Sequence, residues 1–151
     1  MEIINIKDNI DYLKEYFKLC NLEWGDKKSS KELEIYINNK LEKTLSGNYD
    51  KLISVLGLID NNKLIGFISL FQYDGLEKQD LTPWYATMYV KKKYRGKGYS
   101  QMLNDALLEE SKKLGYKKVY LKSDLSNYYE KFGAKYIETL NNGEKLYYID
   151  L

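Results

Sequence analysis

The residues best suited to chemistry form a short basic turn, Arg95-Gly96-Lys97-Gly98-Tyr99-Ser100, preceded by lysines at positions 91–93. A β-branched and aromatic run at positions 84–90 comes before this turn, and apolar residues recur every three or four positions after it. These patterns predict a strand before the turn and a helix after it. A helix N-terminus attracts anions, and glycines let a phosphate approach the main chain. We therefore predict a polyphosphate site at positions 95–100.

Two common nucleotide motifs do not fit this turn. A Walker loop needs four residues between its first glycine and a Gly-Lys-Ser/Thr, and this spacing is absent. A dinucleotide fingerprint would occupy the first strand-to-helix crossover, whereas this turn lies past the middle of the chain. A solvated basic loop, or a patch for RNA or DNA phosphates, remains an alternative. The near-neutral net charge of +2 argues against nucleic acid.

The composition restricts the groups that can move protons. Histidine is absent, which excludes Ser-His-Asp and Cys-His catalysis and any histidine metal site. Cys20 is the only cysteine, so it forms no internal disulfide and no thiolate cluster. The chain has sixteen tyrosines, and a phenol in a cleft is a candidate acid.

Length and hydropathy indicate a single domain over residues 1–151, long enough to bury a substantial core. The acidic, asparagine-rich N-terminus does not resemble a signal peptide, and no apolar run approaches membrane-spanning length. We expect a soluble, cytoplasmic protein with no membrane partner.

In chain order, the patterns predict a strand at 2–7, helices at 8–22 and 30–45, a hairpin at 51–59 and 63–73, the strand at 84–90, a helix from 99 that Gly115 ends, a strand at 117–122, a short helical turn at 127–132, and a hairpin at 134–140 and 144–149.

The run from Val90 to Ser100 resembles the acetyl-CoA-binding segment of the GCN5-related N-acetyltransferase (GNAT) superfamily. The family signature is Arg or Gln, two residues, Gly, one residue, then Gly or Ala; here it is Arg95, Gly98 and Ser100, with serine as a departure. A second block at positions 128–134, Tyr-Tyr-Glu-Lys-Phe-Gly-Ala, resembles the family's Tyr-Glu-Lys-x-Gly-Phe block, with Ala134 in place of the aromatic. The spacing of the two blocks and the order of the predicted elements also fit.

The resemblance implies a GNAT fold of the α/β (α+β) class. This is a single mixed, mostly antiparallel, twisted sheet of six to seven strands with about four helices on its faces. It also implies an N-acetyltransferase that moves acetyl from acetyl-CoA to a primary amine by direct attack in a ternary complex, without a metal. A non-catalytic acyl-CoA-binding or protein-interaction module on the same fold is the alternative. Relatives are often dimers, so a homodimer is an open expectation.

The resemblance also implies roles for individual residues. A backbone N–H of Met88 or Val90 would polarise the thioester carbonyl. Tyr129 corresponds to the family tyrosine that protonates the departing thiolate, the alternative being that it only packs under the cofactor. Asn127 would hydrogen-bond the pantetheine or cap a helix. The implied cofactor-binding set is Met88, Tyr89, Val90, Arg95, Gly96, Lys97, Gly98, Tyr99, Ser100 and Asn127.

The acceptor is a small-molecule or peptide amine that the sequence does not identify. A bacterial subgroup of the family resembles this chain around Asp80 and Glu23, which are candidate proton acceptors beside Asp124 or a water relay. We take Asp80 as the candidate catalytic carboxylate. Glu23, Trp24 and Trp84 are the candidate substrate-binding residues, although a buried tryptophan more often belongs to the core. Acidic loop residues weakly favour a cationic acceptor.

Overall fold

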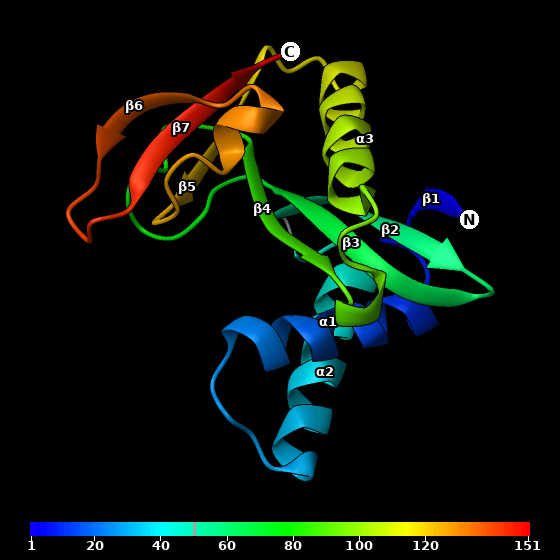
Figure 1. Cartoon of the computed structure of the whole chain (residues 1–151). Coiled ribbons are helices and arrows are strands. Elements are labelled where there is room, and N and C mark those ends of the chain that lie inside the picture. The colour runs from blue at the N-terminus through cyan, green and yellow to red at the C-terminus, as the bar shows by residue number, and fades with distance from the viewer. Residues whose placement is uncertain (50) are drawn as a thin grey trace.

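The protein is described by a computed structural model that covers residues 1–49 and 51–151. In this part of the chain, three α-helices accompany a seven-stranded sheet (Figure 1). The predicted helix count of about four differs because the last helical segment forms only a 3-10 turn, Tyr129–Phe132. A second 3-10 turn spans Lys92–Tyr94. In chain order the elements are β1 (Glu2–Asn5), α1 (Ile10–Trp24), α2 (Ser30–Leu45), β2 (Leu52–Asp60), β3 (Lys63–Phe71), β4 (Trp84–Val90), α3 (Tyr99–Lys113), β5 (Lys118–Ser123), β6 (Lys135–Thr139) and β7 (Lys145–Asp150).

The sheet has the strand order β1-β2-β3-β4-β5-β7-β6. Five neighbouring pairs are antiparallel, and only β4 and β5 run parallel. This is the mixed, mostly antiparallel sheet that the sequence predicted. The parallel pair is registered at a single position, Trp84 opposite Tyr120. The sheet therefore consists of two well-paired parts that meet at one short contact.

Helices cover both faces of the sheet, with α1 and α2 on one face and α3 on the other (Figure 1). Alternate residues of β3 contribute to the two cores because successive side chains of a strand point to opposite faces. Phe67 belongs to the core under α1, and Ile68 to the core under α3. The near-continuous apolar sequence of β2 and β3 follows from this double burial.

Local sequence signals explain where several elements begin. Ser29 and Glu32 form a reciprocal capping box at the start of α2, as a Ser-x-x-Glu pattern predicts. Asn61 and Asn62 join β2 to β3 with φ values of +49° and +60°, a conformation that suits the tight turn of a hairpin. Helix α1 extends to Trp24, two residues beyond the predicted end, and Gly25 follows it. This extension places Glu23 and Trp24 on the last turn of a helix.

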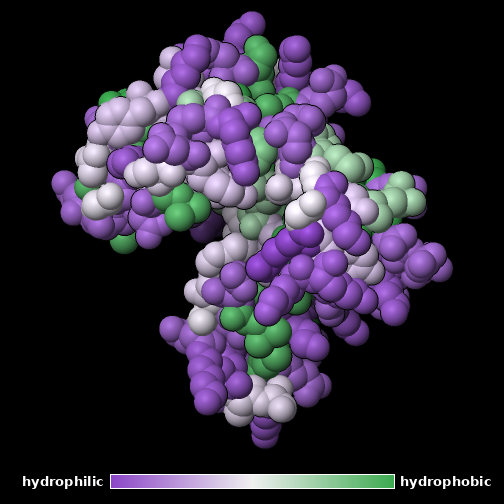
Figure 2. All heavy atoms as spheres, viewed as in Figure 1, coloured by the Kyte–Doolittle hydropathy of each residue, from purple (hydrophilic) through white to green (hydrophobic). Residues whose placement is uncertain are grey.

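No helix within residues 1–49 and 51–151 combines the length and apolar character needed to cross a membrane. The surface is largely hydrophilic in the view of Figure 2.

The packing of α3 leads to a test of stability. Leu103 is fully buried against the sheet, whereas the neighbouring Met102 is 44% exposed. We expect Leu103→Ala to lower the free energy of unfolding by about 2–5 kcal/mol, because the substitution leaves a cavity in the core. Met102→Ala is the matched control and should cost less than about 1 kcal/mol. Urea unfolding measures both values; equal losses would contradict this placement of α3.

Candidate active site

The site is built where β4 and β5 separate. After the single registered pair at Trp84 and Tyr120, the two strands share no further ladder positions. On the other edge of β4, Tyr89 and Val90 remain paired with Phe67 and Gly66 of β3. The second half of β4 is therefore held on one side and open on the other.

The hydrogen-bond register shows which main-chain groups face this opening. The N–H of Lys91 donates to the carbonyl of Ile65 at 2.9 Å, which makes Gly66 and Val90 a non-hydrogen-bonded pair. The N–H and C=O of Val90 therefore point away from β3. Those of Met88, two residues earlier, point the same way, because main-chain direction alternates along a strand. Both residues line the cavity described below.

A β-bulge precedes these residues. Ser69 pairs with Ala86 and Phe67 pairs with Tyr89, so β4 has one more residue than β3 across this interval. Thr87 lies within the bulge and has a φ of +52°, which is unusual for a β-branched residue. No sequence pattern predicts this bulge, because Thr87 fits the β pattern of the run around it.

The basic turn is the second component of the site. Gly96 and Gly98 have φ values of +78° and +83°, in the left-handed region that glycine adopts without steric cost. Gly98 is the N-cap of α3 and offers no side-chain acceptor, so no side chain caps the first N–H groups of the helix. These donors and the helix dipole make the turn an anion site.

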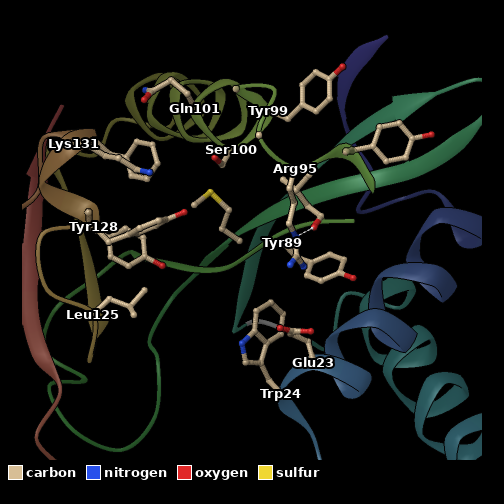
Figure 3. A pocket seen from close by; sticks show the side chains of 17 residues that line it. Glu23, Trp24, Tyr89, Arg95, Tyr99, Ser100, Gln101, Leu125, Tyr128 and Lys131 are labelled. Carbon is tan, nitrogen blue, oxygen red and sulfur yellow. Dashed lines mark hydrogen bonds between the residues drawn. The ribbon is translucent and has the colours of Figure 1, made fainter. Parts of the chain in front are cut away.

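Arg95 has a role that the sequence did not reveal. Its Nε donates to the carbonyl of Val90 at 2.7 Å, and its guanidinium carbon lies 5.6 Å from the centre of the Tyr89 ring. Figure 3 shows the side chain folded back toward the end of β4. Arg95 therefore fixes the turn to the strand and also adds positive charge to the site.

A cavity of about 770 Å³ connects these components. Figure 3 shows its wall from Glu23 and Trp24 at one end to Ser100 and Gln101 at the other, with Tyr128 and Leu125 on the side opposite Tyr89. Figure 2 shows a hollow on this side of the molecule, between the part around β5–β7 and the helices below. The lining residues are Glu23, Trp24, Met88, Tyr89, Val90, Tyr94, Arg95, Gly96, Gly98, Tyr99, Ser100, Gln101, Leu125, Tyr128, Tyr129, Lys131 and Phe132.

Two tyrosines enter the cavity from the 3-10 turn that follows β5. Tyr129 packs edge-on against Tyr85, with ring centres 6.0 Å apart, and against Tyr128 at 4.8 Å. Burial, with smaller contributions from Tyr128 and Asp124, raises the pKa of Tyr129. Its phenol is therefore protonated at neutral pH. Gly133 has a φ of +91° and ends the turn, as the sequence predicted.

The opposite end of the cavity has a different character. Trp24 is 52% exposed and lies edge-on to Tyr89, with 6.3 Å between ring centres. Glu23 supplies the only carboxylate among the lining residues that the structure describes. An aromatic surface beside a carboxylate suits a cationic group.

Two of the predicted residues lie elsewhere. Trp84 is fully buried and its Nε1 donates to the carbonyl of Leu81 at 2.8 Å, so it is part of the core and does not line the cavity. Asp80 lies in a separate hollow beside Tyr120 and Tyr148. It is therefore not positioned to accept a proton in the main cavity.

Lys97 and Asn127 are exposed and are also absent from the cavity wall. Conversely, the sequence did not predict six of the lining residues, which are Tyr94, Gln101, Leu125, Tyr128, Lys131 and Phe132. Gln101 was within reach of prediction, because it lies in the first turn of the helix that follows the glycines. Lys131, whose Nζ lies 4.1 Å from the Tyr128 ring centre, adds a cation to the wall. Within the described residues, no three Cys, Asp or Glu side chains gather as a metal site would require.

Residues 12–134 match the model of the Acetyltransferase (GNAT) family. This match covers most of the chain, and the protein belongs to this family of acyltransferases, as the two sequence motifs predicted. A comparison with curated protein sequences finds no match.

Solved structures share the fold at low sequence identity. The chain is similar to an aminoglycoside 6'-N-acetyltransferase from Enterococcus faecium, with a TM-score of 0.68, 17% identity and coverage of 99% of this chain and 97% of the other. It is similar to the PaiA N-acetyltransferase from Thermoplasma acidophilum in complex with coenzyme A, with a TM-score of 0.62, 21% identity and full coverage of both chains. It is also similar to a GNAT family acetyltransferase from Elizabethkingia anophelis with acetyl-CoA bound. That comparison has a TM-score of 0.55, 17% identity and coverage of 73% of this chain and 83% of the other.

The burial of Tyr129 leads to a prediction about its ionisation. Because desolvation disfavours the phenolate, Tyr129 should titrate above pH 10 in the folded protein. In the unfolded chain the same phenol loses its proton more readily, so the free energy of unfolding should decrease as the pH rises above this value. NMR of the chain carrying [13Cζ]tyrosine gives the titration curve, with the signal assigned by its loss in Tyr129→Phe. A midpoint below pH 10 for this signal would contradict the buried position.

Proposed function

We propose that this protein transfers the acetyl group of acetyl-CoA to a primary amine by direct attack in a ternary complex. The observation that carries the proposal is the single cavity that connects the glycine turn, the open edge of β4 and Tyr129. Each of these features matches one part of the reaction. The turn suits a diphosphate, the strand edge suits an amide-containing arm, and the phenol suits a leaving thiolate.

Charge and main-chain direction support this orientation of the cofactor. Donors of Gly98, Tyr99 and Ser100 face the diphosphate, and Arg95 and Lys131 supply positive charge from two sides of the cavity. The pantetheine arm has two amides, which pair with main-chain groups of Met88 and Val90 that β5 leaves free, while one N–H of these two residues remains for the thioester carbonyl. The thioester then lies beyond Val90, toward Glu23 and Trp24.

The reaction requires two proton movements. A neutral amine attacks the thioester carbonyl, and the negative charge on its oxygen is stabilised by the N–H of Met88 or Val90. When the carbon–sulfur bond breaks, the electron pair stays on sulfur and Tyr129 donates its proton to the thiolate. A thiol with a pKa of about 8.5 is a stronger acid than a phenol with a pKa of about 10, so the proton moves from Tyr129 to sulfur in the same step in which the carbon–sulfur bond breaks. The ammonium proton leaves to Glu23 or to water.

The acceptor is a cationic amine that enters at Glu23 and Trp24. An acceptor with more than one amino group would have one ammonium against Glu23 and the Trp24 ring while another, neutral amine attacks. The Enterococcus faecium neighbour is named for an aminoglycoside, a polyamine of this kind.

An amine panel with acetyl-CoA and thiol detection tests the proposal. We expect turnover with at least one di- or polyamine, and we expect Tyr129→Phe to lower kcat by about a hundredfold with the KM for acetyl-CoA within about twofold. Tyr128→Phe is the matched control, because it removes the adjacent hydroxyl of the same turn, and it should retain most activity. Full activity of Tyr129→Phe would contradict the acid role. Tight acetyl-CoA binding without turnover would indicate a binding module instead.

The glycine turn leads to a second prediction. Gly98→Ala puts a side chain on a residue with a φ of +83° that opens onto the cavity. We expect the variant to weaken CoA binding by about tenfold or more, because the first N–H groups of α3 turn away from the diphosphate. Gly47→Ala is the matched control, since Gly47 has a φ of +79°, no neighbour within 4 Å and no place in the cavity wall. Isothermal titration with CoA compares the two, and similar affinities would contradict the placement of the diphosphate.

A further inference from the structure

Thr87 has an unusual backbone conformation at the point where β4 leaves its regular ladder. Of the five non-glycine residues with positive φ in the described chain, three are asparagine and one is lysine, and only Thr87 is β-branched. Such a residue is strained in this region, because its branched side chain lies close to the main chain. Strain of this kind persists only where surrounding contacts maintain it.

Two consecutive hydrogen bonds maintain it here. Thr87 Oγ1 donates to Ser69 Oγ at 2.5 Å, and Ser69 Oγ lies 2.7 Å from Tyr16 Oη. Ser69 is fully buried and Tyr16 is 2% exposed. Burial also raises the pKa of Tyr16, so its hydroxyl is neutral and available for this bond. The chain of hydroxyls ties the bulge in β4 to β3 and, through Tyr16, to the interior face of α1.

The bulge decides where the next residue points. If Thr87 returned to an extended conformation, β4 would lose the extra residue and shift in register against β3. A one-residue shift turns side chains and main-chain groups to opposite sides. The N–H of Met88 would then face away from the cavity. Three hydroxyls of residues outside the cavity lining therefore control the direction of one main-chain donor.

We infer that Tyr16, Ser69 and Thr87 form a positioning network that aims the Met88 N–H at the thioester carbonyl. This inference rests on the proposed function and goes beyond it, because none of the three residues lines the cavity. It predicts that loss of a hydroxyl in the network weakens polarisation of the carbonyl while cofactor binding persists.

The test uses acetyl-CoA labelled with 13C at the acetyl carbonyl. A hydrogen bond to the carbonyl oxygen moves the 13C resonance downfield, so bound wild-type protein should show this shift without any acceptor amine. In Thr87→Val, which keeps the side-chain shape but lacks the hydroxyl, the resonance should return toward its free position. Where an acceptor is known, kcat should fall by about tenfold with the Kd for CoA within about twofold. Thr87→Ser restores the hydroxyl donor and should recover both the downfield 13C shift and kcat.

Two further variants keep the test decisive. Ser69→Ala removes the middle hydroxyl and should lose the downfield shift as Thr87→Val does. Thermal melting shows whether each variant is folded, and one folded variant is enough for the test. Ser111→Ala is the matched control: Ser111 is equally buried and donates to the carbonyl of Leu107 at 2.7 Å, but it lies in α3 outside the network. It should keep the downfield shift.

The outcomes separate the two proposals. Wild-type protein that does not bind acetyl-CoA would overturn the proposed function, and this inference with it. Binding with a downfield shift that persists in both Thr87→Val and Ser69→Ala would overturn only the positioning network. If Ser111→Ala loses the downfield shift as fully as Thr87→Val and Ser69→Ala do, the positioning network is also overturned, because the effect would then reflect a general loss of packing.

Discussion

The cavity exists because β4 separates from β5 after a single registered pair. Main-chain donors and acceptors are strong polar groups that require partners, and the second half of β4 has them on one edge only. An extended ligand with amides of its own can supply the missing partners as an eighth strand would. The opening therefore suits an extended ligand because of how the sheet is built, before any side chain is considered.

The other elements keep this opening in place and line it. Helices α1 and α3 pack on opposite faces of β3, and β3 in turn holds the paired edge of β4. Helix α3 brings its N-terminus to one end of the opening, and the last turn of α1 brings Glu23 and Trp24 to the other. The 3-10 turn after β5 closes the side with Tyr128 and Tyr129. One cavity thus joins a glycine turn suited to an anion to an aromatic, acidic end suited to a cation.

The sequence predicted the parts that depend on local signals. The glycine turn and the boundaries of β4 follow from residue types within a few positions, and the tyrosine block follows from its motif. What could not be predicted depends on contacts between distant segments. Trp84 and Trp24 are the same residue type, yet one is buried where the strands join and the other is exposed at a helix end. The bulge at Thr87 depends on hydroxyls from β3 and α1, and the position of Asp80 depends on how its loop crosses β5 and β7.

A crystal structure of the protein with acetyl-CoA tests the central claim most directly. The account predicts the diphosphate on the N–H groups around Gly98, the pantetheine amides along Met88 and Val90, and the sulfur within reach of the Tyr129 hydroxyl. A cofactor bound outside the opening, or one whose sulfur lies far from Tyr129 with β4 and β5 closed together, would contradict it.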